Sequence, residues 1–118
     1  MISVIIPTYN RGYIIKRAID SVINQTFDDW ELIIVDDGSD DNTNEIVNDY
    51  KDDRIKYIRN RDRKGACYSR NLGMQNAMGE YFCFLDSDCI WRENFLYDRI
   101  NAAKKHNADF VYGRMNPN

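Results

Sequence analysis

The chain has 118 residues, of which 43% are hydrophobic and 13% aromatic, and it carries a net charge of −3. This length suits one domain with a core of its own, and the apolar content excludes a disordered or low-complexity chain. The acidic balance argues against a non-specific nucleic-acid binder. No apolar run approaches the length of a membrane span, and the amino terminus lacks the pattern of a secretory signal, so we expect a cytoplasmic protein with no transmembrane segment.

Cysteine and histidine content narrows the possible chemistry. Cys67, Cys83 and Cys89 are odd in number and lack C-x-x-C spacing, which favours reduced thiols over a disulfide framework. His106 is the only histidine, which argues against a structural zinc site and most histidine-dependent nucleophile schemes.

Short β-branched runs alternate with helical patterns along the chain. The expected strands are Ile2–Ile6, Glu31–Val35, Ile55–Ile58, Tyr81–Leu85 and Phe110–Tyr112. The expected helices are Tyr13–Asn24, a helix that begins after Asn42 with Glu45 completing a capping box, Ala66–Ala77 and Phe95–Lys105. This alternation predicts an α/β domain with a mainly parallel sheet.

Polar residues follow three of these strands. They are the segments Pro7–Arg11, Asp36–Asp41 and Asp86–Asp88. Ligands of open parallel sheets bind beyond the carboxyl ends of the strands, so we expect the three segments to meet at one rim.

The triplet Asp86-Ser87-Asp88 is the sharpest local feature. On an extended backbone, carboxylates two residues apart point the same way and can hold a hard divalent cation beside a phosphate-bearing ligand. The alternative is a strand that simply ends in polar, turn-capping residues. The buried-looking run before the triplet favours the cation site.

Adjacent Asp36 and Asp37 face opposite ways on a strand, so we expect one to reach the ligand and the other to hold the loop, with Gly38 allowing a tight turn. Tyr9 either stacks on a base or packs half-buried. Arg70 either contacts an anion or forms a surface ion pair.

Two further groups are assigned plainer roles. The basic run Arg59, Arg61, Arg63 and Lys64 is interpreted as a solvated loop, with a lesser chance that one member faces phosphate. Cys89 and Trp91 are interpreted as packing residues.

Five segments, taken together and in order, resemble the family 2 glycosyltransferases. They are Ser3–Asn10, Ser21–Thr26, Glu31–Ser39, Ser69–Gly73 and Gly79–Asp88. The resemblance implies a GT-A fold, which is a three-layer αβα sandwich, together with a nucleotide-diphosphate-sugar donor and Mn²⁺ or Mg²⁺.

The resemblance also implies roles for individual residues. It assigns donor contacts to Pro7, Thr8, Tyr9, Asp37, Gly65, Arg70, Asp86 and Ser87. Tyr9 would stack on the base, and Asp37 would accept a hydrogen bond from it, typically from uracil. Asp88, with Asp86, would hold the metal.

By the same resemblance, the reaction is an inverting transfer to a hydroxyl of a glycan or lipid-linked acceptor, with a carboxylate general base beyond residue 118. We therefore expect residues 1–118 to form a single domain that is the donor-binding half of a glycosyltransferase. Peripheral membrane association and a homodimer formed through an exposed sheet edge or apolar face are further expectations.

Two rival functions remain open. A non-catalytic nucleotide-binding module, or a truncated inactive product, would keep the binding residues without a base. A receiver-type phosphoacceptor domain has a similar size but would need its acidic pair after the first strand. A Rossmann dehydrogenase is disfavoured because no G-x-G-x-x-G follows that strand.

Overall fold

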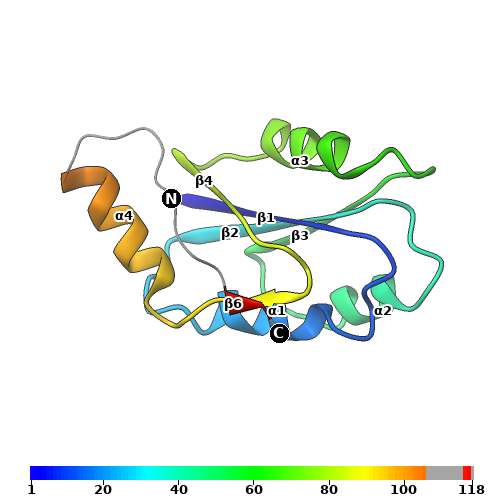
Figure 1. The fold of residues 1–118 in the computed structure, drawn as a ribbon, viewed down its shortest axis with the longest axis horizontal. Helices are drawn as coiled ribbons and strands as arrows, with labels where there is room; N and C mark the ends of the chain where they lie inside the picture. The colour runs from blue at the N-terminus through cyan, green and yellow to red at the C-terminus, as the bar shows by residue number, and fades with distance from the viewer. Residues whose placement is uncertain (106–115, 118) are drawn as a thin grey trace.

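The computed structural model of the chain describes residues 1–105 and 116–117, and its centre is a sheet of four parallel strands (Figure 1). The strands are β1 (Ile2–Thr8), β2 (Trp30–Asp36), β3 (Ile55–Arg59) and β4 (Tyr81–Phe84), in the order β3-β2-β1-β4. The helices are α1 (Ile15–Ile23), α2 (Thr43–Asn48), α3 (Ala66–Gln75) and α4 (Phe95–Lys105). A second, two-stranded antiparallel sheet pairs β5 (Cys89–Ile90) with β6 (Asn116–Pro117).

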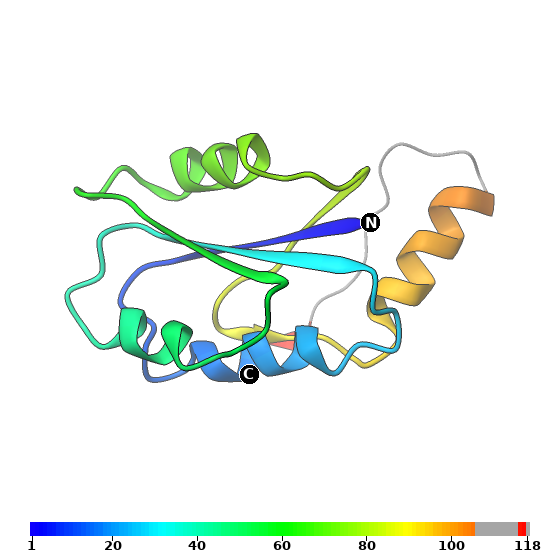
Figure 2. The same ribbon diagram turned by 180° about the vertical axis from the view of Figure 1, so that it is seen from behind.

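Helices cover both faces of the four-stranded sheet (Figures 1 and 2). Helix α3 lies on one face, α1 and α2 lie on the other, and α4 slants past the end of the sheet where β1 begins. This arrangement confirms the predicted three-layer αβα sandwich. The expected strand Phe110–Tyr112 lies outside the described residues.

The core is divided by the sheet, as the alternation of side chains along β1 shows. Ile2, Val4 and Ile6 belong to the larger apolar cluster on the α1 side, whereas Ile5 belongs to a smaller cluster beneath α3. Helix α1 buries four residues at the spacing of one helical face: Ile15, Ala18, Ile19 and Val22. The periodicity that predicted this helix therefore marks the face that it buries.

A buried polar cluster fastens the connection between α3 and β4 to the sheet. The Glu31 carboxylate accepts hydrogen bonds from Ser3 Oγ at 2.6 Å, Lys56 Nζ at 2.8 Å and the Met78 N–H at 2.5 Å. Burial by itself raises the pKa of Glu31, but its bonds to Lys56, Ser3 and Met78 bring that pKa below its ordinary value. The next N–H, of Gly79, donates to Ser3 Oγ at 2.9 Å, where a Cβ would lie only 2.6 Å from the same oxygen.

The start of α2 differs from the predicted capping box. Asn42 occupies the cap position, but its side chain makes no capping hydrogen bond. Instead, Asp41 Oδ1 accepts from the Thr43 N–H at 3.1 Å and from Thr43 Oγ1 at 2.6 Å, while Asp41 Oδ2 accepts from the Gly12 N–H at 2.9 Å. The capping-box prediction is wrong because Asp41, one residue earlier, reaches both the helix and the loop after β1.

Strand β4 forms one edge of the four-stranded sheet, with β1 as its neighbour in that sheet. Phe82 on this strand is 43% exposed, and an apolar cavity of about 200 Å³ lies between β4 and α4. The other three residues of β4 are half-buried, and self-association through an exposed edge or apolar face stays a prediction. Within the described residues, no helix combines the length and apolar character needed to cross a membrane.

Candidate functional site

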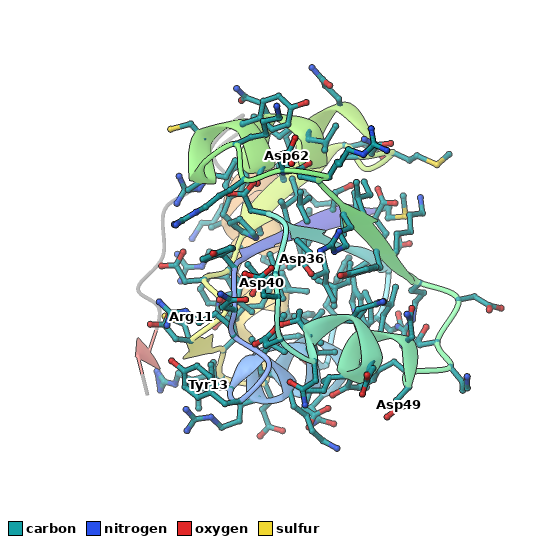
Figure 3. The ribbon with its side chains drawn as sticks, turned by 90° about the vertical axis from the view of Figure 1, so that its right-hand side faces the viewer. Arg11, Tyr13, Asp36, Asp40, Asp49 and Asp62 are labelled. Carbon is teal, nitrogen blue, oxygen red and sulfur yellow. The ribbon has the colours of Figure 1, made fainter. Side chains whose placement is uncertain are left out.

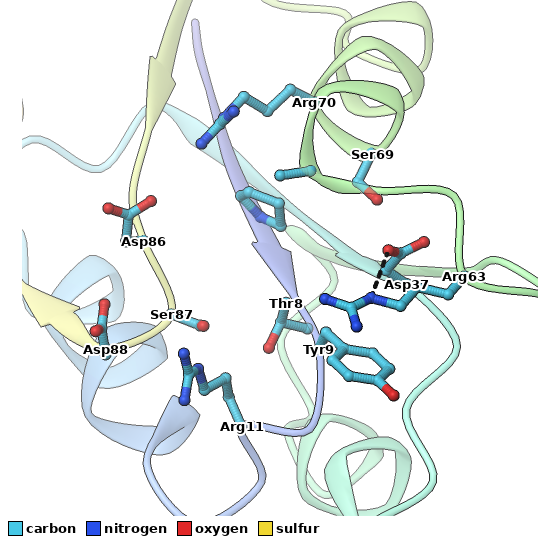
Figure 4. A pocket seen from close by; sticks show the side chains of 12 residues that line it. Thr8, Tyr9, Arg11, Asp37, Arg63, Ser69, Arg70, Asp86, Ser87 and Asp88 are labelled. Atoms are coloured by element: carbon cyan, nitrogen blue, oxygen red, sulfur yellow. Dashed lines mark ion pairs between the residues drawn. The ribbon is translucent and has the colours of Figure 1, made fainter.

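The loops after β1, β2 and β4 meet at one edge of the sheet around a cavity of about 340 Å³ (Figures 3 and 4). Its lining residues are Pro7, Thr8, Tyr9, Arg11, Asp37, Arg63, Ala66, Ser69, Arg70, Asp86, Ser87 and Asp88. Eight of the nine residues predicted for the site are among them. The ninth, Gly65, reaches the site through its backbone, because its N–H donates to Asp37 Oδ2 at 2.8 Å.

Asp37 is a buried and extensively bonded side chain of the cavity. It is 4% exposed, and its carboxylate accepts from the Lys64 N–H at 2.7 Å, the Gly65 N–H at 2.8 Å and Asn60 Nδ2 at 2.9 Å. Burial alone raises the pKa of Asp37, but the bonds from Lys64, Asn60 and Gly65, with the nearby Arg63 charge, lower that pKa below its ordinary value. Asp37 is therefore ionised at neutral pH and acts only as an acceptor.

Asp36 points away from the cavity and holds the loop that follows it. Its buried carboxylate accepts from the Ser39 N–H at 2.9 Å, from Ser39 Oγ at 2.5 Å and from the Tyr57 hydroxyl. Burial and the Asp36 carboxylate raise the pKa of the Tyr57 hydroxyl above its ordinary value. Of the acidic pair, only Asp37 lines the cavity, and both carboxylates anchor loops, whereas the sequence assigned that role to one of them; contact of Asp37 with a ligand stays a prediction.

The loop after β1 is tied to the loop after β2. Asn10 has the left-handed backbone conformation (φ 52°) that asparagine tolerates better than most residues. Its N–H donates to Ser39 Oγ at 2.8 Å, and its Oδ1 accepts from the Asp40 N–H at 2.8 Å. These bonds fix the chain immediately after Tyr9 and so help to hold its ring at the cavity.

A guanidinium group covers the ring of Tyr9. Arg63 Cζ lies 4.0 Å from the ring centroid, and Arg63 Nε lies 3.8 Å from Asp37 Oδ2 (Figure 4). This contact corrects the interpretation of the basic run as a solvated loop for Arg63. Arg63 therefore belongs to the cavity lining. The interpretation is also wrong for Arg59, which ends β3 and donates from Nη2 to the Ser39 carbonyl at 2.9 Å.

The acidic triplet after β4 forms a turn and not the extended segment that was predicted. The Cys89 N–H donates to the Asp86 carbonyl at 3.0 Å, which closes a four-residue turn. Even so, one ligand atom from each of Asp86, Asp88 and Cys89 lies within 4.8 Å of the others. The turn brings the carboxylates together by a different geometry from side-chain alternation.

The donor set at this turn fits a hard divalent cation. Two exposed carboxylates, from Asp86 and Asp88, are the ligand type that Mg²⁺ and Mn²⁺ prefer, and the nearby thiol of Cys89 is softer. Burial, and then the charges of Asp88 and Asp86, raise the pKa of the Cys89 thiol. Cys89 packs in the core as predicted, but the sequence did not indicate that its sulfur would also lie beside the carboxylates.

Cations border the cavity on other sides. Arg70 extends from α3 over the cavity, and Arg11 lies beside Ser87 and Asp88 (Figure 4). Arg11 Nη1 also donates to the Tyr13 hydroxyl at 2.9 Å. These two guanidinium groups give the cavity positive charge next to its carboxylates.

Five site residues were missed by the sequence reasoning or given another role: Arg11, Arg63, Ala66, Ser69 and Cys89. Arg11 lay in a segment already singled out, and Ser69 belonged to a family-like motif, so their positions carried a signal. Arg63 had only the weak signal of a charge run.

Comparisons with solved structures identify the type of fold. TarS 1–349 of S. aureus in complex with UDP-GlcNAc superposes with a TM-score of 0.86 and 32% identity, over 90% of this chain and 32% of that chain. The mannosyltransferase PcManGT from Pyrobaculum calidifontis in complex with GDP-Man and Mn²⁺ superposes with a TM-score of 0.81 and 25% identity, over 86% of this chain and 32% of that chain. The fold is accordingly the GT-A type.

Comparisons of sequence identify the family. The sequence model of glycosyl transferase family 2 matches residues 3–117, so the chain belongs to this family. It is 42% identical to the UDP-Glc:alpha-D-GlcNAc-diphosphoundecaprenol beta-1,3-glucosyltransferase WfgD of Escherichia coli, over 96% of the chain and 45% of that protein. It is 41% identical to the poly(ribitol-phosphate) beta-N-acetylglucosaminyltransferase TarP of Staphylococcus aureus, over 96% of the chain and 36% of that protein. The chain thus spans less than half the length of these curated relatives.

Proposed function

We propose that this chain binds the nucleotide-diphosphate-sugar donor, a UDP-sugar, of an inverting glycosyltransferase, together with Mn²⁺ or Mg²⁺. The observation that carries the proposal is one cavity with an aromatic ring and an ionised acceptor on one side and two carboxylates on the other. Its volume of about 340 Å³ is within the range of small-molecule sites. The TarS neighbour bound to UDP-GlcNAc supports this class of ligand.

The base would bind beside Tyr9 and Asp37. A carboxylate offers about four acceptor positions, and three at Asp37 are used by Lys64, Gly65 and Asn60. The remaining position suits the ring N–H of uracil, whereas in cytosine the same ring nitrogen is an acceptor and only the exocyclic amino group can donate. This reasoning favours UDP over CDP.

The diphosphate would bind beside the turn after β4. Two like charges within 4.8 Å repel each other, so Asp86 and Asp88 favour a cation between them and the phosphates. When bound, the divalent cation supplies charge neutralisation for the leaving diphosphate. Arg11 and Arg70 add positive charge along the same cavity, where they would orient the phosphate oxygens.

The transfer step would invert the anomeric carbon. The acceptor hydroxyl oxygen forms a bond to that carbon as the bond from the carbon to the diphosphate oxygen breaks, and the bonding electron pair stays on the diphosphate. The hydroxyl proton passes to a carboxylate base. We place this base, and the glycan or lipid-linked acceptor, in the part of the longer relatives that this chain does not span.

Residues 1–118 would then be the donor-binding half of the domain. We expect the chain alone to bind UDP but to transfer sugar poorly. Robust transfer by the 118-residue chain alone would show that the base lies within it.

Calorimetric titration tests the donor site. We expect Mn²⁺ to tighten binding of UDP to the wild-type chain but not to Asp88→Ala, because that variant lacks one of the two carboxylates that would hold the cation. Uridine, which has no diphosphate, should bind equally with and without Mn²⁺. Asp53→Ala removes an exposed carboxylate outside the cavity lining and is the matched control.

The outcomes separate the parts of the proposal. If Asp88→Ala keeps the full effect of Mn²⁺, Asp88 does not hold the metal. If the wild-type chain binds neither UDP nor uridine, the proposed function is wrong. If CDP binds as tightly as UDP, the argument from the Asp37 acceptor fails.

A further inference from the structure

Arg63 lies where the base is proposed to bind. Its guanidinium covers the Tyr9 ring at 4.0 Å from the centroid, and its Nε approaches Asp37 Oδ2 at 3.8 Å (Figure 4). The side chain is nevertheless 65% exposed. A single group thus touches both the ring and the carboxylate that the base would use, while water reaches most of its surface.

The position of Arg63 follows from the path of its loop. The next two residues, Lys64 and Gly65, donate their N–H groups to Asp37, and Asn60 donates to the same carboxylate from the other side of Arg63 in the sequence. Three bonds to one buried carboxylate fix the backbone on both sides of Arg63. The guanidinium therefore stays within reach of Tyr9 even though the side chain is largely exposed.

We infer that Arg63 occupies the base subsite of the unliganded chain and that the base must displace its guanidinium in order to stack on Tyr9. This inference rests on the proposed function. One ring face cannot stack on a base and on a guanidinium at the same time. At 3.8 Å, Nε attracts the Asp37 carboxylate without a hydrogen bond, so the acceptor position that faces Arg63 stays open to a base N–H.

Displacement makes nucleoside binding weaker than the cavity alone would allow. Before the base can form its own contacts, Arg63 must lose its cation–π contact with Tyr9 and its exposed ion pair with Asp37. This cost corresponds to about three- to tenfold in the dissociation constant. Removing the guanidinium should recover that factor. The effect should be clearest with uridine, because uridine has no phosphate with which a displaced arginine could pair.

The test compares uridine affinity across variants of the 118-residue chain. We expect Arg63→Ala to bind uridine about three- to tenfold more tightly than wild type. Arg61→Ala, which removes an exposed arginine of the same loop outside the cavity lining, should leave the affinity unchanged. Arg63→Gln keeps much of the side-chain length without the charge and should also bind more tightly, which guards against a folding defect peculiar to the alanine variant.

Side-chain NMR of arginine gives an independent measurement. The Arg63 Nε–Hε resonance should carry a ring-current shift from Tyr9 that Tyr9→Leu removes and that saturating uridine also removes. Loss of this shift with uridine, together with tighter binding by both variants, supports displacement.

Opposite results would overturn the inference. If both Arg63 variants bind uridine more weakly or equally, the guanidinium assists the base or ignores it. If the ring-current shift persists at saturation, Arg63 is not displaced. In either case the proposed function stands as long as the wild-type chain binds UDP, and it fails separately if no uracil nucleotide binds.

Discussion

Asp37→Asn keeps the shape of the side chain but replaces one of its two acceptor oxygens by a donor. In the structure, Oδ1 accepts from Lys64 and Asn60, and Oδ2 accepts from Gly65. An amide can retain the first pair by placing its oxygen there. Its NH₂ group then faces the Gly65 N–H, so one bond is lost and two donors oppose each other in a buried site.

The expected loss of stability follows from these contacts. Asp37 is 4% exposed, and hydrogen bonds to a charged group contribute about 1.5–3 kcal/mol each, so one lost bond and two weakened ones give a loss of roughly 2–4 kcal/mol. At roughly 4 °C per kcal/mol for a domain of this size, the melting temperature should fall by about 8–16 °C. Asp40→Asn, which changes an exposed carboxylate in the same loop, should leave the melting temperature unchanged.

The loss should also depend on pH in a definite direction. The pKa of Asp37 is lowered in the folded chain, so its ionised form contributes stability above the unfolded value of about 4, and that contribution is lost as pH falls through the folded pKa. In melts set at about pH 6 to 8, the difference in melting temperature between wild type and Asp37→Asn should therefore be constant. It should shrink on acidification. Thermal melts followed by circular dichroism measure both quantities.

Two results would refute this reasoning. A melting temperature for Asp37→Asn equal to that of Asp40→Asn would mean that the three bonds do not hold the loop. A difference that grew on acidification would mean that folding raises the pKa of Asp37 instead of lowering it, which would contradict the stabilisation of its carboxylate by the three bonds.

Two further predictions concern packing around the site and are read from the same melts. Thr8 Oγ1 is buried and has no hydrogen-bond partner within the described residues, so Thr8→Val should raise the free energy of unfolding by about 1 kcal/mol. Thr43→Val removes a bonded hydroxyl and should lower the free energy of unfolding by about 1–2 kcal/mol. If Thr8→Val and Thr43→Val shift the melting temperature in the same direction, this prediction is wrong. A Cβ on Gly73 would lie 2.6 Å from Ile5 Cγ2. Gly73→Ala should therefore lower the free energy of unfolding by about 1–3 kcal/mol, despite the better helix propensity of alanine. The control Asn71→Ala changes an exposed residue of the same helix and should cause no loss of stability. A neutral Gly73→Ala would show that α3 can move away from the sheet at no cost.

Much of the fold follows from local pattern. The strand β2 is buried along its whole length, which is why its continuous apolar run predicted a strand covered on both faces. Helix α1 was predicted from the spacing of the residues that it buries. The convergence of three strand ends on one rim was predicted from the parallel topology alone, because the carboxyl ends of parallel strands share one edge.

The errors arose where contacts between segments distant in the sequence accompany the local structure. Asp41 and Asn42 are both good capping residues, and only the position of the loop after β1 decides that Asp41 bonds to the helix start. The Asp86–Asp88 segment is a turn that leads directly into a separate strand, which begins at Cys89 and pairs with β6 near the end of the chain. Neither outcome is encoded within a few residues of the site.

Arg63 shows the same limit for function. Its own neighbours in sequence are charged and exposed, and this pattern is typical of a solvated loop. The contact with Tyr9 depends on Asp37, which lies 27 residues before Lys64 and fixes the loop through backbone N–H groups that no side-chain pattern reveals.

The two sides of the cavity differ in how far they are already organised. On the base side, Asp37 and its three donors form a closed set of bonds, and the conformation that would receive a base exists before any ligand arrives. On the phosphate side, the two carboxylates are exposed, repel each other and lie on a turn beyond the edge strand β4. A nucleoside should therefore find a rigid subsite that the Arg63 guanidinium occupies, whereas a diphosphate should need a cation to complete the subsite that binds it. This asymmetry is why uridine and UDP, compared with and without Mn²⁺, separate the two sides of the site more cleanly than any single substitution.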